Sequence, residues 1–369
     1  MRLRLVADDL TGALDTAAQF VASTGPVPVF WTHPAADTLP PTVAIDSGTR
    51  EQQPAMAAAV AAELAAVLAP APDVIAFKKL DSLLRGHCGR ELAACLRSLP
   101  VRHCIIAPAF PFQGRVTRMG RQYAGTVGGW QQVGEALGET LAREGIHVTP
   151  AHAGDAVPTG TSLWDAETDE DLRRIAQAGL ALESHVLWCG SSGLAGALAG
   201  LQAPVSATLA RPVVGLFGSD HPVTQAQLRA AAPHHVVLPD GGAVSAARLS
   251  ALLGETGVAL AGFDLPDGLA RQDAAARIAQ EMDALTRRIA RPRTLLIAGG
   301  ETLRALCIAL GATRLDVFGQ IIPGVPRSIM RGGRWDGVDV VSKSGAFGTT
   351  DLLRWLVVGP LKQPEGTVA

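Results

Sequence analysis

The chain has 369 residues with 32 basic and 34 acidic side chains, and its net charge of −2 excludes the basic field that nucleic acid or an anionic membrane would require. It contains no run of the roughly 20 apolar residues that a membrane helix needs, and its first residues lack a secretion-signal pattern. Five cysteines without a CxxC pair are typical of buried thiols in a reducing compartment. We therefore expect a cytoplasmic protein of two domains, with no nucleic-acid or membrane partner.

Strand and helix patterns alternate through the first half of the chain. Apolar runs predict strands at Leu3–Val6, Val27–Trp31, Val43–Ile45, Val74–Phe77, Cys104–Ala107 and His185–Trp188. Alanine- and leucine-rich stretches predict helices at Leu10–Val21, Pro54–Leu68, Glu91–Leu96, Asp169–Ala178 and Leu194–Leu201. Such alternation is typical of a mostly parallel sheet with helices on both faces.

The second half repeats this organisation after a change in composition. Gln202–Pro212 is rich in Pro, Ala and Ser without periodicity, which predicts a linker. Strands are then predicted at Val213–Phe217, His235–Leu238, Val258–Leu260, Thr294–Ala298 and Val338–Val341, and helices at Val223–Ala231, Val244–Leu253, Gln272–Ile289, Leu303–Leu310 and Asp351–Val357. The predicted fold class is α/β, with two domains at 1–205 and 206–369, each a mostly parallel sheet flanked by helices.

The turn between the first strand and the first helix carries Asp8, Asp9, Thr11 and Gly12. Ligands of open α/β sheets gather at the carboxyl ends of strands, where such turns lie. Asp9 or Thr11 could instead serve only as the helix cap, a common role for these residues. A cap needs one side chain and this turn offers three, so we favour a functional turn.

Three further strand ends in the first half are followed by loops that place basic residues beside hydrogen-bonding groups. Each loop alone resembles a solvated loop with a surface ion pair. Converging from neighbouring strands, they could bind a carboxylate through a guanidinium and hydroxyls through carboxylates, as a polyhydroxylated acid would require. The candidates in these loops are Arg50, Lys78, Asp81, Ser82, Arg85, Gln113 and Arg115.

Glycine-rich turns distinguish the second half. Gly299–Thr302 follows a strand and opens a helix, an arrangement that points backbone N–H groups at an anion. The loop from Lys343 to Gly348 places a lysine among small residues, which suits phosphate oxygens. The turn with Ser219 and His221 could belong to the same site or form a helix cap. The chain has no P-loop, no GxGxxG after the first strand, no GxSxG turn and no metal-binding histidine spacing.

Taken together and in this order, the motifs resemble those of the four-carbon acid sugar kinase family. The chain departs from the family pattern at Leu14, Leu83, His87 and Ala346, and Ser219–Pro222 stands where the family has Ser-Cys-Ser-Pro. That last change leaves open whether His221 replaces a serine contact to the nucleotide. The motifs that carry the resemblance are Ala7–Ala13, Lys78–Gly86, Ala107–Pro111 with Gln113–Arg115, Gly299–Thr302, Pro323–Pro326 and Lys343–Gly348.

The resemblance implies an ATP-dependent kinase that phosphorylates the terminal hydroxyl of threonate, erythronate or 3-oxo-tetronate to the 4-phosphate. Residues 1–205 would bind the acid and residues 206–369 the nucleotide. Mg²⁺ is expected with the ATP phosphates, although its protein ligands are left open. The expected nucleotide contacts are Ser219, His221, Gly299, Gly300, Glu301, Thr302, Lys343 and Gly345.

Roles in catalysis follow from the same resemblance. We expect Asp9 to accept or orient the hydroxyl proton, with Asp8 as its partner or as a magnesium contact. Arg85 and Lys78 are expected to bind the substrate carboxylate, with Arg50 and Arg115 as second candidates. Thr11, Asp81, Ser82 and Gln113 complete the expected substrate contacts.

Two other classes of function stay open. A metal-dependent phosphatase or lyase acting on a small sugar acid could use Asp8 and Asp9 but would leave the glycine turns without a role. A non-catalytic sensor of sugar acid and nucleotide would leave the acid pair without one. A homodimer is a further open expectation.

Overall fold

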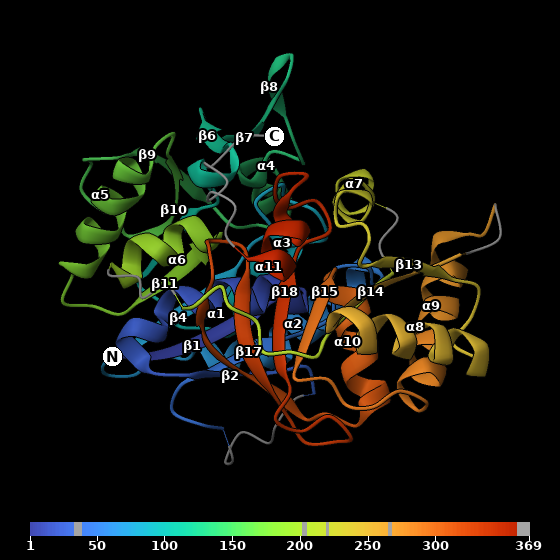
Figure 1. Ribbon diagram of the computed structural model, residues 1–369. Coiled ribbons are helices and arrows are strands. Elements are labelled where there is room, and N and C mark those ends of the chain that lie inside the picture. The colour runs from blue at the N-terminus through green and yellow to red at the C-terminus, as the bar shows by residue number, and fades with distance from the viewer. Residues whose placement is uncertain (33–38, 201–204, 219–220, 265–267, 360–369) are drawn as a thin grey trace. The chain divides into compact units, whose positions relative to one another are not determined.

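The computed structural model describes residues 1–32, 39–200, 205–218, 221–264 and 268–359 (Figure 1). The chain divides into two compact units, Met1–Ala203 and Pro204–Thr367, close to the predicted boundary between residues 205 and 206. Residues 205–212 of the predicted linker form neither helix nor strand, and residues 202–204 lie outside the described ranges. The predicted α/β class is confirmed for both units.

A parallel sheet forms the centre of the first unit. Its strands lie in the order β2 (Val27–Phe30), β3 (Val43–Asp46), β1 (Arg2–Ala7), β4 (Val74–Lys79), β11 (Val186–Gly190), β5 (His103–Ala107), β10 (Gly160–Asp165) and β9 (Val148–His152). Strand β11 is apolar throughout and β5 is apolar apart from His103, as expected for strands covered on both faces, whereas β1 and β4 each carry two basic residues.

Two groups of helices pack in the first unit. Helices α2 (Pro54–Leu64), α3 (Cys88–Ser98) and α4 (Leu137–Arg143) form one group, and α1 (Leu10–Thr24), α6 (Ser192–Ala199) and α5 (Asp169–Leu180) form the other. The short 3₁₀ turn η2 (Ala65–Leu68) ends the stretch that the sequence predicts as one helix. Helix α3 begins one turn before the predicted start, and Leu201 of another predicted helix lies outside the described ranges.

A small antiparallel sheet in the first unit was not predicted. It consists of β6 (Arg115–Arg118), β7 (Arg121–Thr126) and β8 (Gly129–Gln132), and follows the 3₁₀ turn η3 (Pro111–Gln113). Strand β8 is exposed along its whole length, and Val127 in the β7–β8 turn is fully exposed. In Figure 1, β8 projects outward at the top of the view. Because β8 buries no face, its sequence lacks the apolar run by which the other strands were recognised.

The second unit has its own mostly parallel sheet, with strands in the order β13 (His235–Leu238), β14 (Val258–Phe263), β12 (Val213–Phe217), β15 (Thr294–Ala298), β18 (Asp339–Lys343), β17 (Pro326–Arg331) and β16 (Arg314–Gln320). Strand β17 is antiparallel to both neighbours, an arrangement the sequence did not indicate. The helices are α7 (Pro222–Ala230), α8 (Ala243–Thr256), α9 (Arg271–Thr286), α10 (Gly300–Leu310) and α11 (Leu352–Val358), each within a few residues of its predicted bounds.

All five cysteines are free and buried, which agrees with their expected role as core thiols. Within the described ranges, no helix combines the length and apolar character needed to cross a membrane.

Candidate active site

The strand register brings the polar loops of the first unit to one edge of its sheet. Ala7 pairs with Asp46, Gly190 pairs with Lys79, and Gly190 also pairs with Ala107. The strands β3, β1, β4, β11 and β5 therefore end in one row. The loops that carry the predicted substrate residues leave the sheet side by side.

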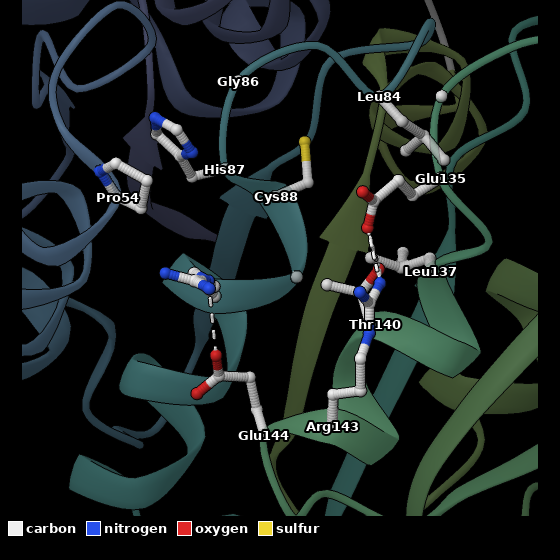
Figure 2. A pocket seen from close by; sticks show the side chains of 13 residues that line it. Pro54, Leu84, Gly86, His87, Cys88, Glu135, Leu137, Thr140, Arg143 and Glu144 are labelled. Carbon is white, nitrogen blue, oxygen red and sulfur yellow. Dashed lines mark hydrogen bonds and ion pairs between the residues drawn. The ribbon is translucent and has the colours of Figure 1, made fainter.

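A cavity of about 510 Å³ adjoins this edge (Figure 2). Its lining includes Gly86–Arg90, and Figure 2 shows Glu135, Thr140 and Arg143 on the side opposite His87 and Cys88. Gly86 has a φ of +76°, and a Cβ there would lie 3.2 Å from Asp8 Oδ2. The glycine thus lets the cavity wall approach the aspartates directly.

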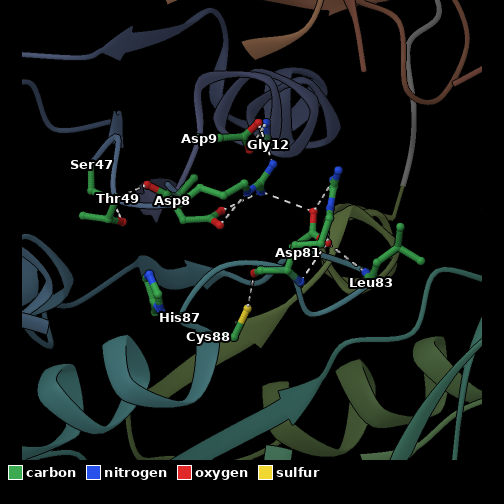
Figure 3. A network of polar contacts seen from close by, with 12 residues as sticks. Asp8, Asp9, Gly12, Ser47, Thr49, Asp81, Leu83, His87 and Cys88 are labelled. Atoms are coloured by element: carbon green, nitrogen blue, oxygen red, sulfur yellow. Dashed lines mark hydrogen bonds and ion pairs between the residues drawn. The ribbon is translucent and has the colours of Figure 1, made fainter. Parts of the chain in front are cut away.

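Arg50 is surrounded by carboxylates at the sheet edge (Figure 3). Its Nε and Nη2 donate to the two oxygens of Asp8, both at 2.8 Å. Nη1 lies 2.9 Å from Asp9 Oδ2, and Nη2 lies 3.2 Å from Asp81 Oδ2. Although burial acts against the charge, the three carboxylates raise the pKa of Arg50. Arg50, a second candidate in the sequence, is therefore the residue that joins the three aspartates.

Asp9 is the helix cap that the sequence offered as one alternative, and its second oxygen lies in the cluster around Arg50. Its Oδ1 accepts the backbone N–H of Gly12 at 2.9 Å and caps helix α1, while its Oδ2 faces Arg50. Burial raises the pKa of Asp9, and the charge of Asp8 adds to that rise, while Arg50 opposes it. The Asp9 side chain is 17% exposed, and a partly buried carboxylate with a raised pKa is a better proton acceptor than an ordinary one.

Asp81 has the opposite character. Its Oδ1 accepts the backbone N–H groups of Leu83 and Arg85, and the Arg85 guanidinium donates to both of its oxygens at 3.0 and 2.7 Å. Although burial opposes the shift, these bonds and the charge of Arg50 hold the pKa of Asp81 well below its usual range. Asp81 therefore stays ionised and fixes Arg85, whose side chain is half-exposed.

Lys78 lies away from this cluster, in a buried network. It is 1% exposed, and its Nζ donates to Glu91 Oε2 of helix α3 at 2.7 Å. Glu91 Oε1 accepts the Thr49 hydroxyl at 2.8 Å, and Thr49 in turn contacts the Ser47 hydroxyl at 2.7 Å. The network holds the loop that carries Arg50, and the ammonium of Lys78, which was expected to bind the substrate carboxylate, is paired with Glu91.

Lys79, which the sequence analysis did not single out, lies at the sheet edge instead. Neighbouring residues of a strand point to opposite faces, so Lys78 meets α3 while Lys79 meets the start of α1. Its Nζ lies 3.3 Å from the position that a Cβ of Gly12 would take. Extending the predicted strand by two residues, from Phe77 to Lys79, would have separated the two lysines.

The other predicted substrate residues occupy the same loops. The Ser82 carbonyl accepts Gln122 Nε2 of β7 at 2.8 Å, which ties this loop to the antiparallel sheet. Arg115 Nη1 donates to the Gln113 carbonyl, whereas its buried Nε has no partner among the described residues. Burial lowers the pKa of Arg115. The hydroxyl of Thr11 is likewise buried without a partner in the described part of the chain.

The second unit gathers its glycine turns in the same way. Phe217 pairs with Ala298, which pairs with Lys343, so β12, β15 and β18 end in one row. Gly299 precedes helix α10 with a φ of +95°, which favours glycine. A Cβ on Gly218 would lie 3.3 Å from Thr302 Oγ1, so these two loops are in contact. Gly300 opens α10, and Glu301 in its first turn is exposed.

Lys343 carries a buried charge with no acid beside it. It is 2% exposed, and its Nζ donates to Thr224 Oγ1 at 3.2 Å and to the carbonyls of Ser344 at 3.0 Å and Gly345 at 3.4 Å. No carboxylate pairs with it among the described residues. Burial lowers the pKa of Lys343 to about 7. A cation in such surroundings fits the phosphates of a nucleotide.

Helix α7 supports this loop. Gln227 Nε2 donates to the carbonyls of Phe347 and Thr349 at 3.0 and 2.9 Å. His221 Nδ1 accepts the N–H of Val223 at 3.2 Å, so the predicted alternative of a helix cap is observed. Ser219 lies outside the described residues. No group of three or more His, Cys, Asp and Glu in the described ranges is arranged to hold a metal ion.

Known proteins with similar sequences match along nearly the whole chain. A family model described as a sugar-binding N-terminal domain matches residues 3–155, and one described as a nucleotide-binding C-terminal domain matches residues 214–353. A D-threonate kinase from Cupriavidus necator is 32% identical over 404 aligned positions, with 95% of each chain covered. The chain belongs to the family of four-carbon acid sugar kinases.

Other members of the family support this assignment. A D-threonate kinase from Bordetella bronchiseptica is 29% identical, and a 3-oxo-tetronate kinase from Pseudomonas fluorescens is 28% identical, each with 95% of both chains covered. Family membership confirms the resemblance stated from the motifs and the predicted enzyme class, a carbohydrate kinase.

Two solved structures share the fold of this family member. A protein from Salmonella typhimurium LT2 has a TM-score of 0.71 at 20% identity, with 95% of this chain and 98% of that chain covered. A protein from Haemophilus influenzae has a TM-score of 0.63 at 20% identity, with the same shares covered.

Proposed function

We propose that the chain is an ATP-dependent kinase that phosphorylates the terminal hydroxyl of a four-carbon sugar acid of the threonate, erythronate or 3-oxo-tetronate type to the 4-phosphate. Residues 1–205 would bind the acid and residues 206–369 the nucleotide. The observation that carries the proposal is Lys343, a buried cation beside glycine turns with no acidic partner among the described residues. A phosphatase or lyase that used Asp8 and Asp9 would leave the glycine turns of residues 206–369 without a role.

Asp9 is the proposed proton acceptor for the terminal hydroxyl. Its raised pKa suits that role, whereas the lowered pKa of Asp81 makes that carboxylate a poor base. Both oxygens of Asp8 are held by Arg50, so Asp8 would orient the cluster rather than take the proton. Arg50 holds the Asp9 carboxylate in place, and its charge opposes the rise in the pKa of Asp9 that burial causes.

The substrate carboxylate is assigned to Arg85 and Arg115. The Arg85 side chain is half-exposed and oriented by Asp81, and Arg115 has a buried Nε without a partner in the described ranges. The loops of Ser82 and Gln113 lie beside these guanidinium groups. Lys78 is left out of the proposal because Glu91 holds it in the interior.

The nucleotide would lie against the loops after β12, β15 and β18. When bound, ATP supplies the phosphoryl group, and its phosphates would meet Lys343, Gly345 and the first turn of α10 with Gly299, Gly300, Glu301 and Thr302. His221 would act by starting helix α7. Since the described residues offer no metal cluster, Mg²⁺ would be held mainly by the phosphates themselves.

A coupled ADP-release screen tests the proposal. Threonate, erythronate and 3-oxo-tetronate isomers are supplied with MgATP, and glucose and a nucleoside serve as controls. We expect turnover with at least one short acid and a ³¹P signal of a phosphate ester on its terminal carbon. Turnover with glucose above that of every acid would contradict the substrate class. Binding of acid and ATP without ADP release would favour a sensor.

A homodimer and a cytoplasmic location also belong to the proposal. The five free, buried cysteines suit a reducing compartment. Light scattering on the purified chain measures the oligomeric state.

A further inference from the structure

Two polar groups at the start of helix α1 have no partner in the described structure. Lys79 is 6% exposed, and no hydrogen bond or ion pair with a described residue reaches its Nζ. Thr11 is 7% exposed, and its hydroxyl is buried without a partner within the described ranges. The buried Thr11 hydroxyl is costly to leave unsatisfied, and beside it the Lys79 side chain is buried along its length while its ammonium makes no hydrogen bond or ion pair within the described ranges, so their position points to a ligand.

The amino terminus of α1 lies at the same place. A Cβ on Gly12 would lie 2.6 Å from Asp9 Oδ1 and 3.3 Å from Lys79 Nζ, so the missing side chain is what allows the first turn to approach both groups. Asp9 caps the N–H of Gly12, while the N–H groups of Leu10 and Thr11 stand before the helical hydrogen-bond ladder. The first turn of a 15-residue helix attracts anions.

We propose that Thr11, Gly12 and Lys79 form the site in the first unit that receives the phosphoryl group, and that Lys79 is a further catalytic residue. This inference rests on the proposed function. In the transfer, the terminal oxygen of the acid bonds to phosphorus and its proton passes to Asp9. The bond between that phosphorus and the bridging oxygen breaks, and ADP leaves with the electron pair. Lys79 would neutralise the charge on the transferring oxygens.

The position of Lys79 favours the phosphoryl group over the substrate carboxylate. Asp9 acts on the terminal hydroxyl, so groups beside Asp9 face the reacting end of the acid. The carboxylate lies at the other end of the four-carbon chain, where Arg85 and Arg115 are assigned. Arg50 and Arg85 make the ion pairs with Asp8, Asp9 and Asp81, whereas Lys79 acts on Asp9 and Asp81 through its charge and its ammonium makes no ion pair within the described ranges. The Lys79 ammonium can therefore bind a ligand.

Lys79→Met, which keeps the length of the side chain but removes the charge, tests the site. Removing one donor to a transition-state oxyanion lowers kcat by about 10²–10³-fold, and we expect a fall of this order. Binding of the acid alone and of ATP alone, measured by calorimetry, should be nearly unchanged. Lys79→Arg should recover part of kcat. Thr11→Val should lower kcat less, and it carries the test if Lys79→Met does not fold.

Inorganic phosphate is the direct probe. To remove binding at the nucleotide loops, phosphate is titrated into the full chain carrying Lys343→Met and compared with the chain carrying both Lys343→Met and Lys79→Met. Loss of a charge-assisted hydrogen bond should weaken phosphate binding by on the order of tenfold or more. Equal phosphate binding in the two proteins overturns the inference.

The controls separate this inference from the proposed function. If Lys79→Met weakens binding of the acid alone but leaves kcat and phosphate binding unchanged, Lys79 binds the carboxylate and the inference is wrong, while the kinase assignment stands. If no acid releases ADP with the unmodified chain, the proposed function fails. In that case the phosphate titration still decides whether Thr11, Gly12 and Lys79 bind a phosphoryl group.

Discussion

The two sheets differ in whether the buried cation at the carboxyl ends of their strands is paired with carboxylates. In the first unit Arg50 is held by Asp8, Asp9 and Asp81, whereas in the second unit Lys343 meets only neutral oxygens among the described residues. Mutual pairing fixes side chains before any ligand arrives, which suits a site that must orient a hydroxyl. A cation without an acid is unfavourable until an anion binds, which suits a site for phosphates. At the edge of the first sheet, Lys79 resembles Lys343 of the second unit, because neither lysine has an ion pair with a described residue.

Asp9→Asn should have the largest effect on kcat. This result would show that the paired edge, meaning the cluster of Arg50 with Asp8, Asp9 and Asp81, performs the chemistry. We expect kcat to fall by on the order of 10²–10⁴-fold, because the amide cannot accept the hydroxyl proton. ATP affinity should be unchanged. Steady-state kinetics and calorimetry measure both quantities. Asp165→Asn, which alters a carboxylate that accepts the Met119 and Gly120 N–H groups, is the control. Near-normal turnover in folded Asp9→Asn would remove Asp9 from the mechanism.

Lys343→Met should have opposite effects on binding and on stability. Losing a charged donor should weaken ATP binding by about 10–100-fold. Removing a buried charge that lacks an acidic partner should raise Tm. Lys343→Arg, which keeps the charge, is the comparison for both measurements. A variant that loses stability and keeps its ATP affinity would show that the lysine is structural.

The Thr49→Val variant tests whether the position of Arg50 depends on the buried network of Lys78, Glu91 and Thr49. The change removes the hydroxyl that joins Glu91 to the loop of Arg50. Because one buried hydrogen bond is lost, we expect kcat/KM to fall by about threefold to tenfold. Because Arg50 opposes the raised pKa of Asp9, a displaced Arg50 should move the acidic limb of the kcat/KM profile to higher pH. Thr294→Val removes a comparable buried hydroxyl in the second unit and should leave that limb in place. Thr49→Ser keeps the hydroxyl and should therefore keep the acidic limb at its original pH.

The pH dependence of stability tests the Lys343 site by itself. The pKa of Lys343 is about 7 in the folded chain, against about 10.4 for an unfolded lysine. Between these values the unfolded chain binds more protons, so the destabilisation by Lys343 is full below the lower pKa and disappears as the pH rises towards the upper one. Denaturant unfolding of the unmodified chain and Lys343→Met should therefore differ most at neutral pH and converge in alkali. A constant difference would contradict this account.

Sequence reasoning predicted the fully buried parallel strands well, but it missed the parallel strands β9 and β10 and the antiparallel strands. Strands such as β5 and β15 are buried on both faces, so they read as continuous apolar runs. Strands β8 and β16 have partly or fully exposed residues, and their mixed composition gives no such run. The antiparallel pairing of β17 depends on contacts between distant residues, which periodicity does not report.

The candidate site shows the same limit. The turn of Asp8 and Asp9 was visible because its polar residues are adjacent. The role of Glu91 could not be recognised from the sequence, because its partner Thr49 lies 42 residues away. Lys78 was chosen over Lys79 because the strand was predicted to end at Phe77, which left both lysines in a loop without a defined direction.

The burial of every cysteine makes the chain suitable for labelling at a chosen point. A thiol in the core is shielded from reagents, and burial raises the pKa of Cys88 to about 12, which suppresses its reactive thiolate. Val127→Cys would place a reactive thiol on the fully exposed β7–β8 turn. Because Gln122 of β7 binds the carbonyls of Ser82 and Pro108, a fluorophore attached there would report on these loops as the acid enters, without touching a proposed substrate contact.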